Sequence, residues 1–207
     1  MANFGKIRAL FLGSNIKSSI LQQYIDINNL KENSEGYFST DIKIKEKKYF
    51  LYFKEFNFNL NESSIEDNNI EEYLNNFDII FLVYNKNEKH SIRLIEEIWT
   101  ILEKKDNKLD TRYKVLLCGK QKKKSILGSI FKKEPKKKHR KSAIKFMEEK
   151  DIDDCGIINV DNITDVYDEI NKLLTNYIDN KGIKKVVKNF NIKEEPNNSC
   201  SCKCLIQ

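Results

Sequence analysis

The sequence predicts an α/β protein in which helices cover both faces of a mostly parallel sheet. Two observations indicate this fold class. Short apolar runs alternate along the chain with segments whose apolar residues recur at helical spacing. The run DIIFLVY at residues 78–84 is uninterrupted, and YKVLLC at 113–118 is a second run typical of buried parallel strands. With 207 residues, 40% of them hydrophobic, the chain can bury one substantial core.

The first part of the chain predicts one strand, one helix and a pair of strands. Residues 6–12 form an apolar run interrupted only by Arg8, which predicts a buried strand. A helix is expected next, because four residues follow at helical spacing, namely Ile20, Leu21, Tyr24 and Ile25. Residues 38–56 alternate apolar and charged side chains around a turn expected at 45–48. This alternation predicts two antiparallel strands with one buried face.

Strands and helices then alternate along the rest of the predicted core. The strand at 78–84 is followed by a helical stripe of Ile92, Ile95, Ile98, Trp99 and Leu102. The strand at 113–118 is followed by a helix marked by Ala143, Ile144 and Met147. A strand at 155–160 precedes a last helix marked by Val166, Ile170, Leu173, Leu174 and Tyr177. The order β, α, ββ, β, α, β, α, β, α is the pattern of a parallel sheet with helices on both faces.

Two segments fall outside this core. Residues 120–141 are dominated by lysine and are expected to be an exposed insertion, and residues 181–207 are expected to be a flexible tail. Residues 1–180 are then the single domain. No stretch reaches the roughly 20 apolar residues that span a bilayer, and no signal peptide is indicated, so we expect synthesis in the cytosol. The net charge of +6 favours acidic partners, and the five cysteines do not form a disulfide framework.

The tail carries the most specific pattern. The last four residues, CLIQ, match the prenylation pattern, and the final Gln indicates a farnesyl group on Cys204. Cys200 and Cys202 are candidates for palmitoylation, the second signal that stable anchoring needs. The alternatives are a chance ending or a metal knot in CSCKC, although this spacing is tighter than that of paired zinc ligands. We therefore expect the chain at the cytoplasmic face of a membrane, either the plasma membrane or an endomembrane.

Several segments, taken in order, resemble Ras-superfamily small GTPases, the Ras and Rab branches especially. They are KIRALFLG and KSSILQQYID near the start, DIIFLVYNKNEKHSIRLIEEIWTIL and VLLCGK further on, and the prenylation pattern. The resemblance covers roughly residues 5–180. It implies a P-loop NTPase-like G domain with a six-stranded sheet and nucleotide at the carboxyl ends of the strands. It also implies GTP or GDP with Mg²⁺ as cofactor, effector or regulator proteins as partners, and a monomer.

The resemblance places a phosphate loop at residues 13–18. Three residues match the pattern G-x-x-x-x-G-K-[ST] as first glycine, phosphate-binding lysine and Mg²⁺ ligand, and they are Gly13, Lys17 and Ser18. The loop is two residues short, and Ile16 stands where the second glycine belongs, although a β-branched residue disfavours positive φ. Two interpretations stay open. The loop holds phosphate, or it is a bare strand-to-helix turn in which Ser14 or Asn15 caps the helix.

The other nucleotide motifs of the family are altered in this chain. Thr40 is the match for the threonine that completes the Mg²⁺ shell. The second switch should read Asp-x-x-Gly followed by Gln, but residues 57–62 read NFNLNE. In the guanine motif Asn-Lys-x-Asp, Lys120 matches the lysine, whereas Lys122 offers only donors where an acceptor is needed. GTP hydrolysis is therefore expected to be weak or absent, and no catalytic residue is named.

Three functions are consistent with these patterns. The first is a prenylated, membrane-anchored Ras/Rab-like protein in signalling or membrane trafficking that has lost most nucleotide chemistry and works through protein partners. The second is an active GDP/GTP switch with a shortened phosphate loop. The third is a polyanion-binding module that uses the lysines of residues 120–141, although Phe131 is the one aromatic residue there that could stack on a base. Nucleic acid is therefore not the expected partner.

Overall fold

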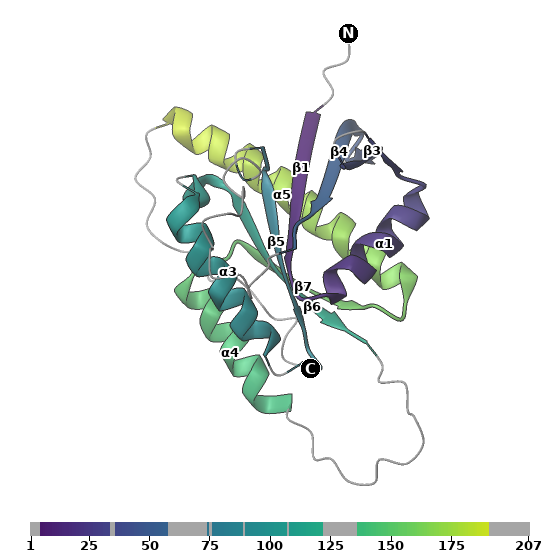
Figure 1. Ribbon diagram of the computed structural model, residues 1–207. Helices are drawn as coiled ribbons and strands as arrows, with labels where there is room; N and C mark the ends of the chain where they lie inside the picture. The colour runs from purple at the N-terminus through teal and green to yellow at the C-terminus, as the bar shows by residue number, and fades with distance from the viewer. Residues whose placement is uncertain are drawn as a thin grey trace.

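A computed structural model describes residues 5–33, 36–57, 74, 76–88, 90–106, 108–121 and 136–190, with only the helical backbone at 136–141 and 181–190. Within these residues seven strands form one sheet (Figure 1). They are β1 (Gly5–Gly13), β2 (Lys31–Glu32), β3 (Phe38–Ile44), β4 (Lys47–Glu55), β5 (Ile79–Asn85), β6 (Tyr113–Lys120) and β7 (Asp154–Asn159). The helices are α1 (Ile16–Asn28), α3 (Ser91–Lys105), α4 (Lys136–Glu149) and α5 (Ile163–Phe190), with a short 3₁₀ turn at Leu109–Thr111.

The sheet has the order β2-β3-β4-β1-β5-β6-β7 and is mostly parallel. Strands β4, β1, β5, β6 and β7 run parallel to one another, whereas β3 pairs antiparallel with both β4 and β2. The α/β class and the mostly parallel sheet are thus confirmed. The expected count of six strands is wrong, because the two exposed residues Lys31 and Glu32 pair with Ser39 and Phe38 as an additional strand. Strand β2 consists of two charged residues, so no hydrophobic pattern in the sequence predicts it.

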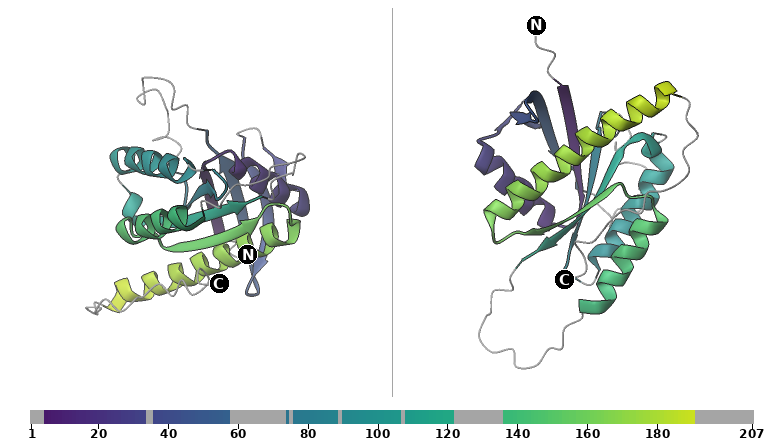
Figure 2. Two further views of the ribbon diagram at one scale, coloured as in Figure 1. Left: turned by 90° about the horizontal axis from the view of Figure 1, so that it is seen from below. Right: turned by 180° about the vertical axis from the view of Figure 1, so that it is seen from behind.

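Helices cover both faces of the sheet, as predicted (Figure 2). Helices α1 and α5 pack on one face, where Tyr24 meets Phe53 edge to face with ring centroids 5.1 Å apart. Helices α3 and α4 pack on the other face, where Trp99 meets Phe146 at 5.7 Å. The inner strands β1, β5 and β6 are buried on both sides, which explains their nearly continuous apolar runs.

The hairpin between β3 and β4 turns where the charge alternation predicted. Lys45 and Glu46 both have positive φ, at 47° and 65°, as a two-residue turn between twisted antiparallel strands requires. The Lys45 ammonium lies 2.6 Å from the carboxylate of Asp179 on α5. The tip of the hairpin is therefore tied to the helix that packs beneath it.

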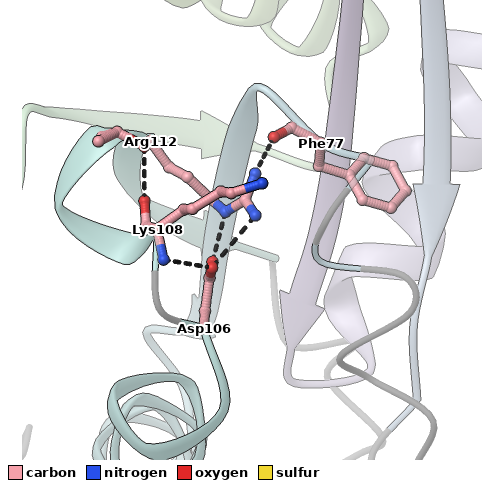
Figure 3. Close-up of polar contacts among 5 residues, drawn as sticks. Phe77, Asp106, Lys108 and Arg112 are labelled. Atoms are coloured by element: carbon pink, nitrogen blue, oxygen red, sulfur yellow. Dashed lines mark hydrogen bonds and ion pairs between the residues drawn. The ribbon is translucent and has the colours of Figure 1, made fainter.

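A buried ion pair lies at the same end of the sheet, where the parallel strands β5 and β6 begin (Figure 3). The guanidinium of Arg112 donates to both carboxylate oxygens of Asp106 and to the carbonyl oxygen of Phe77. The backbone N–H of Lys108 donates to the same carboxylate at 3.0 Å. Both charged side chains are buried. Because Phe77 precedes β5 and Arg112 precedes β6, the network connects the starts of these two strands.

Helices account for part of the two segments placed outside the core. Helix α4 begins at Lys136, inside the predicted insertion of residues 120–141, and residues 122–135 lie outside the described chain. Helix α5 continues to Phe190, past the predicted start of the tail at 181. In the part of the chain that the structure describes, no helix is long and apolar enough to cross a membrane.

Candidate functional site

The loop between β1 and α1 lies at the carboxyl ends of the parallel strands, where α/β sheets usually bind ligands. Gly13 closes β1 with a φ of +115°. A Cβ atom there would overlap the carbonyl oxygen of Val83 and come within 2.7 Å of Cδ1 of Ile95. Glycine is therefore required for the close contact of β1 with β5 and α3, whether or not the loop meets a ligand.

Backbone N–H groups of this loop are bonded within the protein. Ser14 N donates to the carbonyl of Val83 at 2.9 Å, Lys17 N donates to that of Ser14 at 3.0 Å, and Ser18 N donates to that of Asn15 at 3.2 Å. A phosphate loop needs such N–H groups to point at the ligand. Asn15 is the N-cap but makes no side-chain cap bond, and the buried hydroxyl of Ser14 has no partner among the described residues. The loop is a tight turn without the side-chain cap that the sequence suggested.

Lys17 and Ser18 are both paired with side chains at the end of β4. The side chain of Lys17 is only 1% exposed, and its Nζ lies 3.2 Å from Oε1 of Glu55 and 2.7 Å from Oδ1 of Asn57. The hydroxyl of Ser18 donates to the same Glu55 oxygen at 2.6 Å. The two residues that match the phosphate lysine and the Mg²⁺ ligand thus share a carboxylate of the protein itself. We call these four residues the Lys17 cluster.

Glu55 is the member of the Lys17 cluster that sequence reasoning missed. Strand β4 runs parallel to β1 with Glu55 opposite Phe11, so it ends beside the loop that follows β1. The N–H of Phe56 donates to the carbonyl of Phe11 at 3.1 Å and holds that end in register. The available signal was the position of Glu55 as the last charged residue of the alternating segment. The resemblance places the acidic residue of the second switch two positions later, where the chain has Asn57.

Ile16 fills the space above the end of β6. It is buried, and a Cβ atom added to Gly119 would lie 2.8 Å from both its Cδ1 and its Cγ2 atoms. Gly119 is the residue at which the resemblance begins the guanine motif. Ile16, which stands in the place of the second loop glycine, therefore packs against Gly119 near the end of β6. A side chain at position 119 would overlap it.

Of two further candidate residues, Thr40 lies apart from the Lys17 cluster, whereas Lys120 directly follows Gly119, the residue that packs against Ile16 of the loop. Thr40 is opposite Leu51, four residues before Glu55, which places it about 13 Å along the sheet at roughly 3.3 Å per residue. Its hydroxyl donates to the carbonyl of Asp41 at 3.4 Å. Lys120 ends β6 with an exposed side chain. The structure brings Gly13, Lys17 and Ser18 together in one loop. The remaining predicted residues lie outside the part of the chain that the structure describes, and they are Lys122, Cys200, Cys202 and Cys204.

The residues around the loop do not fit a magnesium nucleotide. Lys17 already has an anionic partner, the N–H groups of Lys17 and Ser18 are bonded to the loop, and Ile16 fills the neighbouring space. Among the residues described, no three His, Cys, Asp or Glu side chains are grouped so that they could hold a metal ion.

A second candidate surface lies on β1, β4 and the residue that precedes β3, on the face of the sheet opposite α1. Phe50 is 39% exposed, and Tyr52 and Lys54 follow it at alternate positions of β4. Lys6 Nζ lies 4.5 Å above the ring of Tyr52, and Lys54 Nζ lies 4.5 Å above the ring of Tyr37. These cation–π contacts hold charged groups over aromatic rings at the surface. We call these five residues the aromatic–cationic face.

A cavity of about 230 Å³ lies between β6, β7 and α4. Its walls include the cysteines Cys118 and Cys155, together with Met147 and Ile157, and Lys172 lines it from α5. Burial raises the pKa of the Cys118 thiol, which keeps it protonated. The cavity is thus mostly apolar and holds an unreactive thiol.

Comparison with known proteins gives no further assignment, because the chain matches no family model and no curated protein.

Proposed function

We propose that this chain is a membrane-anchored Ras/Rab-like protein of the small GTPase family that acts through protein partners rather than through nucleotide turnover. The pairing of Lys17 with Glu55 carries the proposal, because the residue that should neutralise phosphate is buried against a carboxylate of the protein. The mostly parallel sheet with helices on both faces supports the G-domain part of the proposal, because it is compatible with a P-loop-like fold.

The aromatic–cationic face is the surface that we propose for partner binding. Interfaces are enriched in aromatic residues at their centres, and Phe50 and Tyr52 supply such a centre. Lys6 and Lys54 flank the rings, whereas Asp41 faces Phe50 from β3. A partner with an apolar anchor and acidic residues around it fits this arrangement.

The anchor is the predicted lipidated tail. A farnesyl group on Cys204 supplies one membrane signal, and acyl groups on Cys200 and Cys202 supply the second signal that stable attachment takes. Helix α5 connects the domain to this tail.

Isothermal titration of the purified full-length chain with GTP, GDP and ATP in Mg²⁺ tests the loss of nucleotide binding. We expect no binding up to millimolar nucleotide, and mass spectrometry of untreated protein is expected to find no guanine nucleotide. Submicromolar affinity for GTP or GDP would show instead that the chain is an active switch.

Vesicle flotation tests the anchor independently of the nucleotide. Farnesylated chain is expected to float with vesicles, and the Cys204→Ser variant is expected to remain unbound. Equal flotation of the two proteins would remove the prenyl group from the proposal. The Cys155→Ser variant is the matched control, because this cysteine lies in the folded domain.

A further inference from the structure

We propose that Glu55 is an internal ligand that takes the place of a bound anion in the Lys17 cluster and keeps small polyphosphates out of it. The inference rests on the proposed function, since it explains how the domain folds with a phosphate lysine but without phosphate. It assigns to this loop a latent oxyanion site whose present occupant is a carboxylate of the chain.

A buried ammonium needs an anionic partner. Moving an unpaired charge out of water is so unfavourable that buried lysines are almost always paired. Lys17 is 1% exposed, and among the residues that the structure describes the carboxylate within ion-pair distance of it is that of Glu55. The amide oxygen of Asn57 adds a neutral acceptor at 2.7 Å. The charge of Lys17 is therefore balanced by Glu55.

Glu55 receives the same donors that an oxyanion would receive. Its Oε1 lies 3.2 Å from Lys17 Nζ and accepts from the hydroxyl of Ser18 at 2.6 Å. Carboxylate and phosphate oxygens accept charge-assisted hydrogen bonds from ammonium and hydroxyl donors in the same way. The Ser14 hydroxyl in the same loop is buried without a partner among the described residues, so a further donor is present there.

Truncation of Glu55 should open this site. In Glu55→Ala the chain loses the carboxylate, and Lys17 keeps its position on the first turn of α1 without an anionic partner. An added oxyanion of suitable size can then bind to Lys17 and Ser18. In the wild-type chain the Glu55 carboxylate occupies this position, where it contacts both Lys17 and Ser18.

Thermal unfolding with inorganic pyrophosphate as the probe tests the proposal. At about a 100-fold excess of pyrophosphate over its Kd, the Tm of Glu55→Ala is expected to rise by about 5 to 10 °C relative to sodium chloride of equal ionic strength. Wild type should show no such difference. The Glu46→Ala variant is the matched control, since Glu46 also pairs with a lysine, Lys43, but at an exposed turn.

The double variant Lys17→Met, Glu55→Ala locates the effect. Its Tm should not respond to pyrophosphate, because the buried cation is absent. An equal response of Glu55→Ala and Glu46→Ala would overturn the proposal, and so would a response that persists in the double variant.

The conservative variant Glu55→Gln covers the case in which Glu55→Ala does not fold. It keeps the side-chain shape and an acceptor for Ser18 but removes the charge, and pyrophosphate is expected to raise its Tm in the same direction. Failure of both variants to fold even with pyrophosphate would overturn the proposal. These outcomes are separate from the nucleotide titration of wild type, in which GTP binding would refute the proposed function instead.

Discussion

Substitutions at the two ends of the Lys17–Glu55 pair should have unequal effects on stability. Glu55→Gln leaves the ammonium of Lys17 buried at 1% exposure without a counter-charge. Removal of one partner of a buried pair lowers the free energy of unfolding by about 3 to 5 kcal/mol, and the 20% exposure of Glu55 places this pair near the lower figure. Lys17→Met leaves instead a carboxylate that water reaches and that Ser18 still donates to, at a cost of about 1 kcal/mol.

Urea unfolding followed by circular dichroism measures this difference. We expect the free energy of unfolding to fall by about 3 kcal/mol in Glu55→Gln and by about 1 kcal/mol in Lys17→Met. Extrapolation errors of about 10 to 15% are small enough to resolve the two. The double variant should be close to Lys17→Met alone, because no buried charge is stranded in it. The reasoning is refuted if Lys17→Met proves as destabilising as Glu55→Gln, or more so.

Three other perturbations test the fold around the site. Gly119→Ala should destabilise the protein by about 1 to 3 kcal/mol through overlap with Ile16, and Ile16→Ala in the same chain should recover part of that loss in urea unfolding. Asp106→Asn should cost about 3 kcal/mol by leaving the buried Arg112 without its counter-charge, with Asp110→Asn as an exposed control. Burial, and then the charge of Tyr167, raise the pKa of Tyr24 above its ordinary value of 10.0, so the folded state keeps a proton that the unfolded state loses. Stability should therefore be insensitive to Tyr24 below about pH 10 and fall above it, and Tyr24→Phe should flatten that fall in denaturation curves between pH 8 and pH 11.

The elements with long hydrophobic patterns could be predicted from the sequence, and elements without such patterns could not. The runs at 78–84 and 113–118 became β5 and β6, because strands buried on both faces must be apolar throughout. Lys31 and Glu32 became a strand only because the chain turns back after Asn29, which has a left-handed φ of 49°, and pairs with β3. Such a two-residue strand depends on its neighbour rather than on its own composition.

For the candidate site, only the residues that are close together in the sequence could be predicted. The sequence shows that Lys17 and Ser18 follow a strand and begin a helix, and the structure places them there. The sequence does not show which side chains meet them. Glu55 is 38 residues away along the chain from Lys17, and Gly119, which accommodates Ile16, is more than 100 residues away from it. Contacts of this range follow from strand order, which apolar periodicity does not specify.

The length of α5 has a consequence for how the domain would be presented to a membrane. The last core residue of this helix is Tyr177, and the helical backbone continues to Phe190, about 20 Å farther at 1.5 Å per residue. Figure 2 shows its last turns extending past the sheet. Each residue inserted after Tyr177 would turn the end of α5 by about 100° around the helix axis relative to the sheet. For the membrane-anchored protein that we propose, the length of α5 therefore sets how the aromatic–cationic face is oriented relative to the bilayer.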